Sequence, residues 1–339
     1  MASATTAPSI PDRPFDSDPG RSYTLPARYY WEPETYAREM DAIFARAWVC
    51  VGHGETLREP GDYTTFTVGE ENVFVVRGKD AVLRAFRDIR AHRAHERDES
   101  RPTPVRVEEF CALVYVNLDM DAAPLAEQSA GLEADIRGFA PDLDDLTHAH
   151  RLSFDLKANW KNVIDNFLEC YHCPVAHPAF AGLVELDTYR IVNHGIYSTH
   201  HARAGGRENN AYDTLGADVR DHAVWWLWPN TCILRFPGSA NIMTMRMIPV
   251  GPEQTHQIID FDFLDATPDE AQREAIKYVD EVLTPEDISI VESVQRGLRS
   301  RGYNQGRFMV DDERSGMSEH GVHYFHSLVL AALEGRGAA

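Results

Sequence analysis

Four side chains that commonly bind metal ions lie close together in the segment 160–178: Asp165, Glu169, His172 and His177. On a single helix the first three would lie at i, i+4 and i+7 and share one face, which is costly to bury without a cation. Pro174 lacks an amide hydrogen, so we expect the helix to end or bend just before it and to turn His177 back towards His172. Each histidine alone is explained by a structural role, but the group favours a site for Fe, Zn or Cu.

A third protein ligand is available at Asp287. One interpretation is structural, because Thr284 and Asp287 have the spacing of a capping box around Pro285. We favour the other interpretation, in which Asp287 heads a helical stripe with Val291, Val294 and Leu298, so that its carboxylate lies on a buried face and needs a partner. Two imidazoles and one carboxylate form the facial triad of Fe(II) oxygenases, which leaves positions open for dioxygen and substrate.

Composition excludes several other classes of protein. The chain has 339 residues, 43% of them hydrophobic, which is enough for a substantial core. Thirty-three Lys and Arg against 53 Asp and Glu give a net charge of -20, so we expect no nucleic-acid partner. The N-terminus is polar and no apolar run approaches the roughly 20 residues that span a bilayer, so we expect a cytoplasmic protein that does not enter the membrane.

The cysteines predict thiols rather than disulfides. There are five, and only Cys170 and Cys173 lie close together in the sequence. A redox pair there is disfavoured, because no thioredoxin-like βαβ pattern surrounds it. We expect Cys170 and Cys173 to be packing residues or neighbours of the metal site.

Periodicity divides the chain into three parts: an N-terminal arm and helix (1–47), a small β unit (48–122) and a larger domain (123–339). The arm is expected to be loosely attached to about residue 28, and a helix follows from Pro33. Strands following one another in the larger domain favour an antiparallel sheet, hence an α+β fold. The expected strands are 64–68, 72–77, 112–118, 152–156, 188–203, 224–235, 241–249 and 257–264, and the expected later helices are 161–171, 268–283, 285–300 and 319–333.

The segment 159–178 resembles the iron-binding helix of Rieske non-haem iron oxygenase catalytic (alpha) subunits, which hydroxylate aromatic rings and other substrates. The resemblance is strongest to the branch that acts on choline, glycine betaine and stachydrine. Segments 228–231, 286–297 and 318–326 also resemble that branch, so the similarity covers nearly the whole chain from about Tyr29. It implies an antiparallel-sheet helix-grip (START-like) catalytic domain with one Fe(II) bound by His172, His177 and Asp287.

The same resemblance implies roles for the two acidic residues and an oligomeric state. In the family, the acidic residue at the place of Glu169 hydrogen-bonds to a cluster-ligating histidine of the neighbouring subunit and carries electrons between centres. We expect Glu169 to face a subunit boundary, and Asp165 to orient the iron ligands from behind. Relatives form rings of three, so a trimer or a hetero-oligomer is expected.

The sequence departs from the family in the small β unit. A Rieske [2Fe-2S] cluster takes two thiolates and two imidazoles, from Cys-x-His and Cys-x-x-His motifs. Here residues 84–95 resemble the region of the first motif, with Arg90 in place of the cysteine and His92 as the one remaining ligand, and the second motif is absent. Cys111 has no Cys or His spaced to assist it. We therefore expect a truncated Rieske-type domain without a cluster.

Loss of the cluster leaves three interpretations of function. In the first, the chain is an iron oxygenase that hydroxylates or N-demethylates a small molecule, with electrons from a separate Rieske-bearing subunit and reductase. Arg87, Arg90 and Arg93 would then be candidate docking charges, although a solvated loop explains each one alone. In the second, it is a stand-alone iron oxidase that uses substrate electrons. In the third, it is a non-catalytic regulatory or structural paralogue in a hetero-oligomer.

Three tryptophans bear on the substrate, which the resemblance suggests is an amine or a quaternary ammonium compound. Strand alternation puts Trp226 and Trp228 on one face and Trp225 on the other. Aromatic faces attract quaternary ammonium groups, but large aromatics also dominate protein cores. We favour ordinary core packing for this group.

Overall fold

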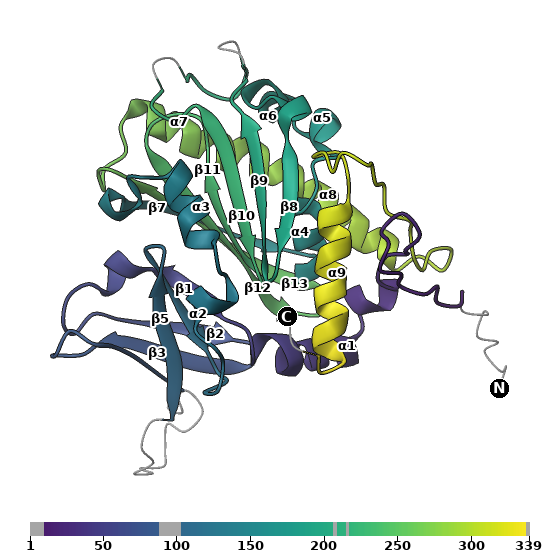
Figure 1. Ribbon diagram of the computed structural model, residues 1–339, viewed down its shortest axis with the longest axis horizontal. Coiled ribbons are helices and arrows are strands. Elements are labelled where there is room, and N and C mark those ends of the chain that lie inside the picture. The colour runs from purple at the N-terminus through teal and green to yellow at the C-terminus, as the bar shows by residue number, and fades with distance from the viewer. Residues whose placement is uncertain (1–9, 88–102, 206–208, 215–216, 337–339) are drawn as a thin grey trace.

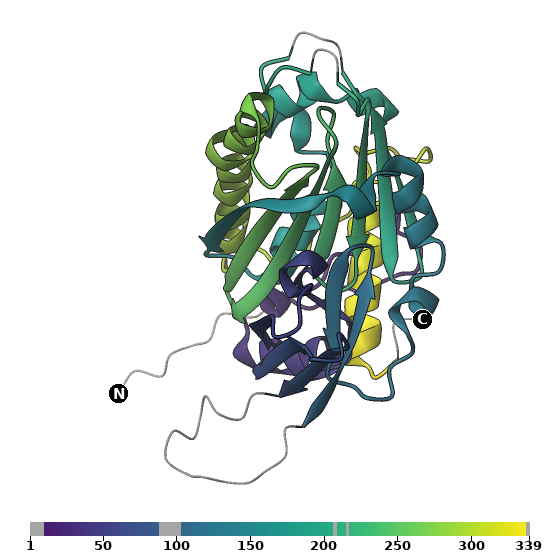
Figure 2. The ribbon, with the colours of Figure 1, turned by 90° about the vertical axis from the view of Figure 1, so that its left-hand side faces the viewer.

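Two antiparallel sheets form the framework of the computed structural model, which describes residues 10–87, 103–205, 209–214 and 217–336 (Figure 1). The smaller sheet has the order β1-β6-β5-β4-β3-β2, and the larger has the order β7-β13-β12-β11-β10-β9-β8. The smaller sheet lies at one end of the larger one (Figure 2). The smaller contains β1 (Val49–His53), β2 (Tyr63–Val68), β3 (Glu71–Arg77), β4 (Leu83–Arg87), β5 (Pro104–Phe110) and β6 (Leu113–Asn117). The larger contains β7 (Thr147–Leu156), β8 (Arg190–His194), β9 (Tyr197–Arg203), β10 (Asp221–Leu227), β11 (Thr231–Arg235), β12 (Asn241–Gly251) and β13 (Gln254–Phe263).

Helices cover both faces of the larger sheet. Successive residues of a strand point to opposite faces of the sheet, so the neighbours Trp225 and Trp226 on β10 show which helix covers each face. Trp225 Nε1 donates to Asp135 of α3 at 2.6 Å, whereas the Trp226 ring packs against Phe325 of α9 at 5.6 Å. The α-helices are α1 (Pro33–Glu39), α2 (Leu125–Gln128), α3 (Leu132–Phe139), α4 (Trp160–Phe167), α5 (Cys173–Ala176), α6 (Pro178–Leu183), α7 (Glu270–Tyr278), α8 (Thr284–Leu298) and α9 (His320–Leu333). The other helical turns are Ala27–Tyr30, Met40–Phe44, Gly54–Leu57, Leu143–Asp145, Leu186–Thr188 and Val279–Leu283.

The tryptophan group belongs to the core, as expected. Trp225 and Trp226 are fully buried and Trp228 is 5% exposed. Trp226 packs edge to face on Trp228 and on Phe325, and Trp228 packs on Phe325 with tilted rings. The core-packing interpretation is therefore confirmed.

Helices α7 and α8 run into one another through a π-helical turn, Val279–Leu283. Pro285 explains this turn, because its ring would clash with the carbonyl group four residues earlier and it has no amide hydrogen to donate there. Thr284 is not an N-cap: the helix is already formed at Leu283, and no side-chain cap is present. The capping-box interpretation, which the sequence analysis disfavoured, is therefore excluded. The predicted buried stripe is wrong at Val294, which is 45% exposed, while Gln295 is buried.

The N-terminal arm is not loose over residues 10–28, contrary to expectation. Phe15 stacks on His323 with ring centroids 4.6 Å apart, and Leu25 is 1% exposed. The Leu25 amide donates to His326 Nδ1, and the Thr24 amide donates to the Gly306 carbonyl group. These apolar and backbone contacts hold the arm against α9 and the segment before it. None of the helices in the described ranges is long and apolar enough to cross a membrane.

A buried ion pair joins the N-terminal helix to α4, the helix that leads into the candidate metal site. Lys161 Nζ lies 2.7 Å from Glu39 Oε1 and both side chains are fully buried. Trp160 Nε1 donates to the other Glu39 oxygen, and Lys161 Nζ also donates to Asn159 Oδ1. Burial raises the pKa of Glu39 and lowers that of Lys161, so the charges depend on each other.

Removing one partner of this pair should be far more damaging than removing both. We expect Glu39→Ala to lower the free energy of unfolding by about 3–5 kcal/mol, because it leaves a buried ammonium group unpaired. Urea unfolding followed by tryptophan fluorescence measures this change. The double variant Glu39→Met with Lys161→Met is the control and should be considerably more stable than the single variant. Equal loss in both would contradict this role for the pair.

Candidate metal centre

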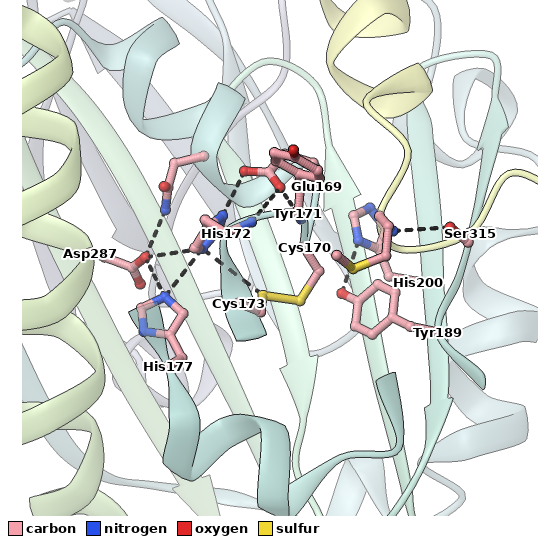
Figure 3. Close-up of a disulfide and its surroundings, with 12 residues drawn as sticks. Glu169, Cys170, Tyr171, His172, Cys173, His177, Tyr189, His200, Asp287 and Ser315 are labelled. Carbon is pink, nitrogen blue, oxygen red and sulfur yellow. Dashed lines mark hydrogen bonds and ion pairs between the residues drawn. A yellow bond between two sulfur atoms is a disulfide. The ribbon is translucent and has the colours of Figure 1, made fainter. Parts of the chain in front are cut away.

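Three donor atoms converge between α5 and the first turn of α8 (Figure 3). His177 Nε2 lies 3.1 Å from His172 Nε2 and 3.0 Å from Asp287 Oδ1. The remaining distance, from His172 Nε2 to Asp287 Oδ1, is 3.7 Å. Nitrogen and oxygen donors about 2.1 Å from one ion lie roughly 3 Å apart when their bonds are perpendicular. The donors therefore fit a single metal ion, and two imidazoles with one carboxylate suit Fe(II).

A one-turn helix brings the two histidines together. His172 is the N-cap residue of α5 and His177 is its C-cap residue. Pro174 lies in the first turn of α5, where its missing amide hydrogen is no loss. The predicted bend is therefore present, but Pro174 starts a new helix instead of ending the preceding one.

Two carboxylates fix the orientation of the imidazole rings. His172 Nδ1 lies 2.6 Å from Glu169 Oε1, and His177 Nδ1 lies 2.8 Å from Glu286 Oε2. A ring that donates its Nδ1 hydrogen to a carboxylate presents the Nε2 lone pair on its other side, where a metal can bind. Asn166 Nδ2 holds the third ligand by donating to Asp287 Oδ1 at 2.7 Å.

The electrostatics of the site favour a bound cation. Burial lowers the pKa of His177, but its hydrogen bonds to Asp287 and Glu286 and their negative charges outweigh that effect, so its pKa is raised. The same negative charges attract a metal ion into the space between the donors.

Asp165 does not orient the ligands, contrary to expectation. Helix α4 ends at Phe167, so Asp165, Glu169 and His172 do not share a helical face. Asp165 Oδ2 accepts from the Tyr30 hydroxyl at 2.6 Å, and Oδ1 lies 3.0 Å from His326 Nε2. Its carboxylate therefore binds the N-terminal segment to α9. The orienting groups are Glu169, Glu286 and Asn166, and no periodic pattern singled out the last two.

Close packing explains where α4 ends. A Cβ atom on Gly321 of α9 would lie 2.5 Å from the Leu168 carbonyl oxygen, so only glycine fits at this contact. Beyond it, the Cys170 amide donates to the Gly316 carbonyl group at 2.7 Å instead of to the preceding turn. The helical ladder is thus replaced by contacts with the C-terminal segment.

Glu169 points towards His172, a candidate iron ligand, and not away from it. Besides His172 Nδ1, its carboxylate accepts from the backbone amides of Tyr171 and His172. Its side chain is only 11% exposed. The expectation that Glu169 faces out of the pocket is therefore wrong for the single chain. The groups that face outward beside it are Tyr171, 49% exposed, and Val175, 88% exposed.

Cys170 and Cys173 form a disulfide, which corrects the expectation of thiols (Figure 3). The chain turns back after α4, so that the two Cα atoms come within 5.0 Å. The bridge encloses Tyr171 and His172 in a short loop and limits the positions that His172 can take. The other cysteines, Cys50, Cys111 and Cys232, are free and buried.

A largely apolar cavity of about 100 Å³ adjoins the three ligands. Alternating residues of β10 to β13 form its floor: Val224, Leu234, Met243, Met245, Gln257 and Ile259. Four rings form one wall, Phe180, Tyr189, His222 and Phe236, with contacting pairs 4.8 to 6.3 Å apart. These residues come from separate elements, so no spacing in the sequence could have grouped them.

The chain belongs to the family of ring-hydroxylating oxygenase alpha subunits, because the model of the catalytic domain of that family matches residues 143–335. A second model, of the Rieske [2Fe-2S] domain, matches residues 47–106. The predicted α+β fold, with a helix-grip catalytic domain and a small Rieske-type β unit, is thereby confirmed, as is the enzyme class, a non-haem iron oxygenase. Absence of the cluster stays a prediction.

Individual relatives give similar alignments over nearly the whole chain. The carnitine monooxygenase oxygenase subunit of Escherichia coli K12 is 34% identical over 356 residues, covering 93% of this chain and 95% of that protein. The chloroplastic choline monooxygenase of Atriplex hortensis is 26% identical, covering 89% and 76%. The solved structure of the quaternary ammonium Rieske monooxygenase CntA with L-carnitine has a TM-score of 0.83 at 33% identity, covering 95% and 99%.

Substitutions should distinguish the candidate metal ligands from Asp165, a carboxylate that we expect not to bind the metal. We expect His172→Ala and His177→Ala to lose nearly all bound iron, because two donors hold a divalent ion poorly, whereas the unmodified chain binds about one iron. Asp165→Asn is the matched control and should retain its iron, since Asp165 contacts Tyr30 and His326 and no ligand. Metal analysis after anaerobic Fe(II) loading and desalting measures this. Equal iron retention in all three variants would refute the assignment.

Proposed function

We propose that this chain is the mononuclear iron subunit of an oxygenase that oxidises a small amine or quaternary ammonium compound, with electrons from a separate Rieske-bearing protein. The observation that carries the proposal is the converging set of His172, His177 and Asp287 beside an apolar cavity. When bound in such a triad, Fe(II) supplies activation of dioxygen at its open positions.

The residues of the chain prepare the site for this chemistry. Glu169 and Glu286 hold the imidazole tautomers that leave Nε2 free for a metal. Asn166 fixes the Asp287 carboxylate through one hydrogen bond. The apolar floor of the cavity keeps bulk water from the substrate, which protects a reactive oxidant from side reactions.

The proposed substrate class rests on relatives and on the ring wall. The similar proteins are named for carnitine, choline and quaternary ammonium compounds. The wall formed by Phe180, Tyr189, His222 and Phe236 offers aromatic faces that attract a cationic ammonium group. Hydroxylation and oxidative N-demethylation both begin with attack on a C–H bond, and both fit this site.

The proposed need for an outside electron donor rests on cysteine chemistry. A Rieske cluster takes two thiolates, yet Cys50 is the only cysteine in the matched residues 47–106. Burial raises the pKa of Cys50 to about 11 and that of Cys111 to about 12, so both are protonated thiols at neutral pH in the absence of a metal. His92 lies outside the described residues. A monooxygenase consumes two electrons and two protons for each dioxygen, and these must then come from elsewhere.

The surface beside Glu169 is the proposed docking place for the donor. Tyr171 and Val175 are exposed large side chains near His172, and a partner docked there would cover them. One relative is described as transferring electrons between subunits. A trimer, or a mixed ring with a cluster-bearing partner, would cover this surface. Arg87 is already paired with Glu71 at 2.7 Å, and Arg90 and Arg93 lie outside the described residues.

Turnover experiments test the electron source. Fe(II)-loaded protein with choline and dioxygen should give at most about half a product per iron when alone, because oxidation of Fe(II) to Fe(III) supplies one of the two electrons needed. Turnover should continue only when a Rieske protein and its reductase are added. Product formed over many turnovers without a donor would instead establish substrate electrons. No substrate-dependent dioxygen uptake by the iron-loaded protein, with or without donor, would favour the non-catalytic paralogue.

A matched pair of variants tests the role of Glu169. Glu169→Gln and Glu286→Gln each replace a carboxylate that contacts a ligand histidine through Nδ1. If Glu169 also connects the iron to the donor, Glu169→Gln should reduce donor-driven turnover at least about tenfold more than Glu286→Gln, with similar yields in a single turnover. Parallel losses in both assays would show that Glu169 only orients His172.

A further inference from the structure

One ring of the cavity wall, His222, is held in a single tautomer. Its Nδ1 atom lies 3.1 Å from the Arg235 carbonyl oxygen, and a carbonyl group can only accept, so Nδ1 carries the hydrogen. Burial lowers the pKa of His222 to about 3, so the ring is neutral at pH 7. Its Nε2 atom is therefore an unprotonated nitrogen, which accepts a hydrogen bond and cannot donate one.

This acceptor belongs to the cavity. His222 and Val224 alternate with Ala223 on β10, so both side chains lie on the cavity face of the sheet. His222 is 2% exposed, and its Nε2 atom makes no hydrogen bond within the described part of the chain. It is also not one of the polar atoms that packing seals off completely. A buried acceptor without a partner is costly, so the cavity suits a ligand that donates a hydrogen bond here.

Aromatic rings surround the His222 imidazole. The ring centroids of Phe236, Phe180 and Tyr189 lie 4.8, 5.4 and 6.1 Å from its own. Phe180 belongs to α6, which begins directly after the candidate ligand His177, so these rings lie beside the metal site. Aromatic faces attract an ammonium group. A small ammonium compound with a hydroxyl group can therefore place its cation on the rings and donate its hydroxyl hydrogen to Nε2.

The other polar ring of the wall, Tyr189, is already engaged. Its hydroxyl group lies 3.2 Å from His200 Nδ1 (Figure 3), and His200 Nε2 lies 3.0 Å from the Ser198 hydroxyl group. His200 and Ser198 are fully buried on β9. Tyr189 therefore offers its ring face to a ligand, while its hydroxyl group is bound to the sheet.

Gln257, on the cavity floor, is too far from the ring wall to replace His222 as the acceptor. Val224 is in register with Phe261 of β13 through β11 and β12. Gln257 lies four residues further along β13 than Phe261, so its backbone is displaced from that of Val224 by roughly 14 Å across the strands and 13 Å along them. A ligand as small as choline cannot rest on the ring wall and also reach Gln257.

We propose that His222 is a specificity residue that accepts a hydrogen bond from a hydroxyl group of the substrate. The site then binds ammonium compounds that carry an alcohol more tightly than those that carry only alkyl groups. The inference rests on the proposed function for the place where the substrate binds. It adds to that function one required group on the substrate and the residue that recognises it.

Choline and propyltrimethylammonium are a matched pair of probes, because a methyl group replaces the hydroxyl group and the cation is the same. Isothermal titration calorimetry of the anaerobic Fe(II)-loaded full chain should give at least about fivefold tighter binding of choline, as expected for a hydrogen bond to a buried acceptor. Equal or tighter binding of propyltrimethylammonium would overturn the inference, and so would binding of neither.

Iron content and dioxygen uptake of the same samples report separately on the proposed function. A preference for choline in a chain that takes up no dioxygen would support the inference and contradict the proposed function. Dioxygen uptake with both compounds, without a preference in binding, would do the reverse.

Variants assign the preference to His222. His222→Phe keeps an aromatic ring without the acceptor, so it should lose the preference for choline and bind propyltrimethylammonium about as tightly as the unmodified chain. His222→Gln returns an acceptor near the position of Nε2 and should recover part of the preference. The matched control is His201→Phe, because His201 is in register with Ala223 on the opposite face of the sheet.

The control should keep the full preference for choline. An unchanged preference in His222→Phe would show that the hydroxyl group binds the metal or another residue, and would contradict the inference. Equal loss of the preference in His201→Phe and His222→Phe would contradict it as well. The comparison of the two compounds on the unmodified chain decides the matter if His222→Phe does not fold.

Discussion

The structure depends on one electrostatic constraint: two imidazoles and three carboxylates crowd into a small space. His172 and His177 face Asp287 with donor atoms 3.0 to 3.7 Å apart, and Glu169 and Glu286 stand behind the rings. Without a cation, the carboxylates would repel one another and the imidazole lone pairs would face each other. A divalent ion resolves both conflicts, so the geometry of the site is explained by a metal better than by packing.

The fold supplies rigidity around this arrangement. The π-helical turn before α8 sets how α8 is rotated about its axis, and this rotation directs the Asp287 carboxylate towards the histidines. The one-turn α5 fixes the spacing between the histidines, and the disulfide closes the loop that carries the first of them. Behind α4, the buried pair of Glu39 and Lys161 anchors the N-terminal helix. Ligands carried on supported elements need little reorganisation when a metal binds.

The candidate ligands and much of the fold could be predicted from the sequence, because the residue patterns that indicate them are local. The three candidate ligands, which the structure brings together, follow from residue type, spacing and proline, and the resemblance adds the fold. Asp165 was misassigned because the spacing argument assumed an unbroken helix, whereas contact with Gly321, distant in sequence, ends α4 at Phe167. The ring wall could not be predicted for the same reason, since tertiary contacts bring those side chains together. The disulfide joins residues only three apart, and it was not expected because the cysteine count is odd and no thioredoxin-like pattern surrounds the pair.

The central claim is that a mononuclear iron site persists beside a Rieske-type domain that holds no cluster. The most direct measurement is iron and acid-labile sulfide in the full chain after anaerobic reconstitution with Fe(II) and sulfide, with electron paramagnetic resonance of the reduced protein. The account predicts about one iron per chain, no sulfide and no [2Fe-2S] signal. About three irons and two sulfides per chain, with the resonance of a reduced Rieske cluster, would contradict it.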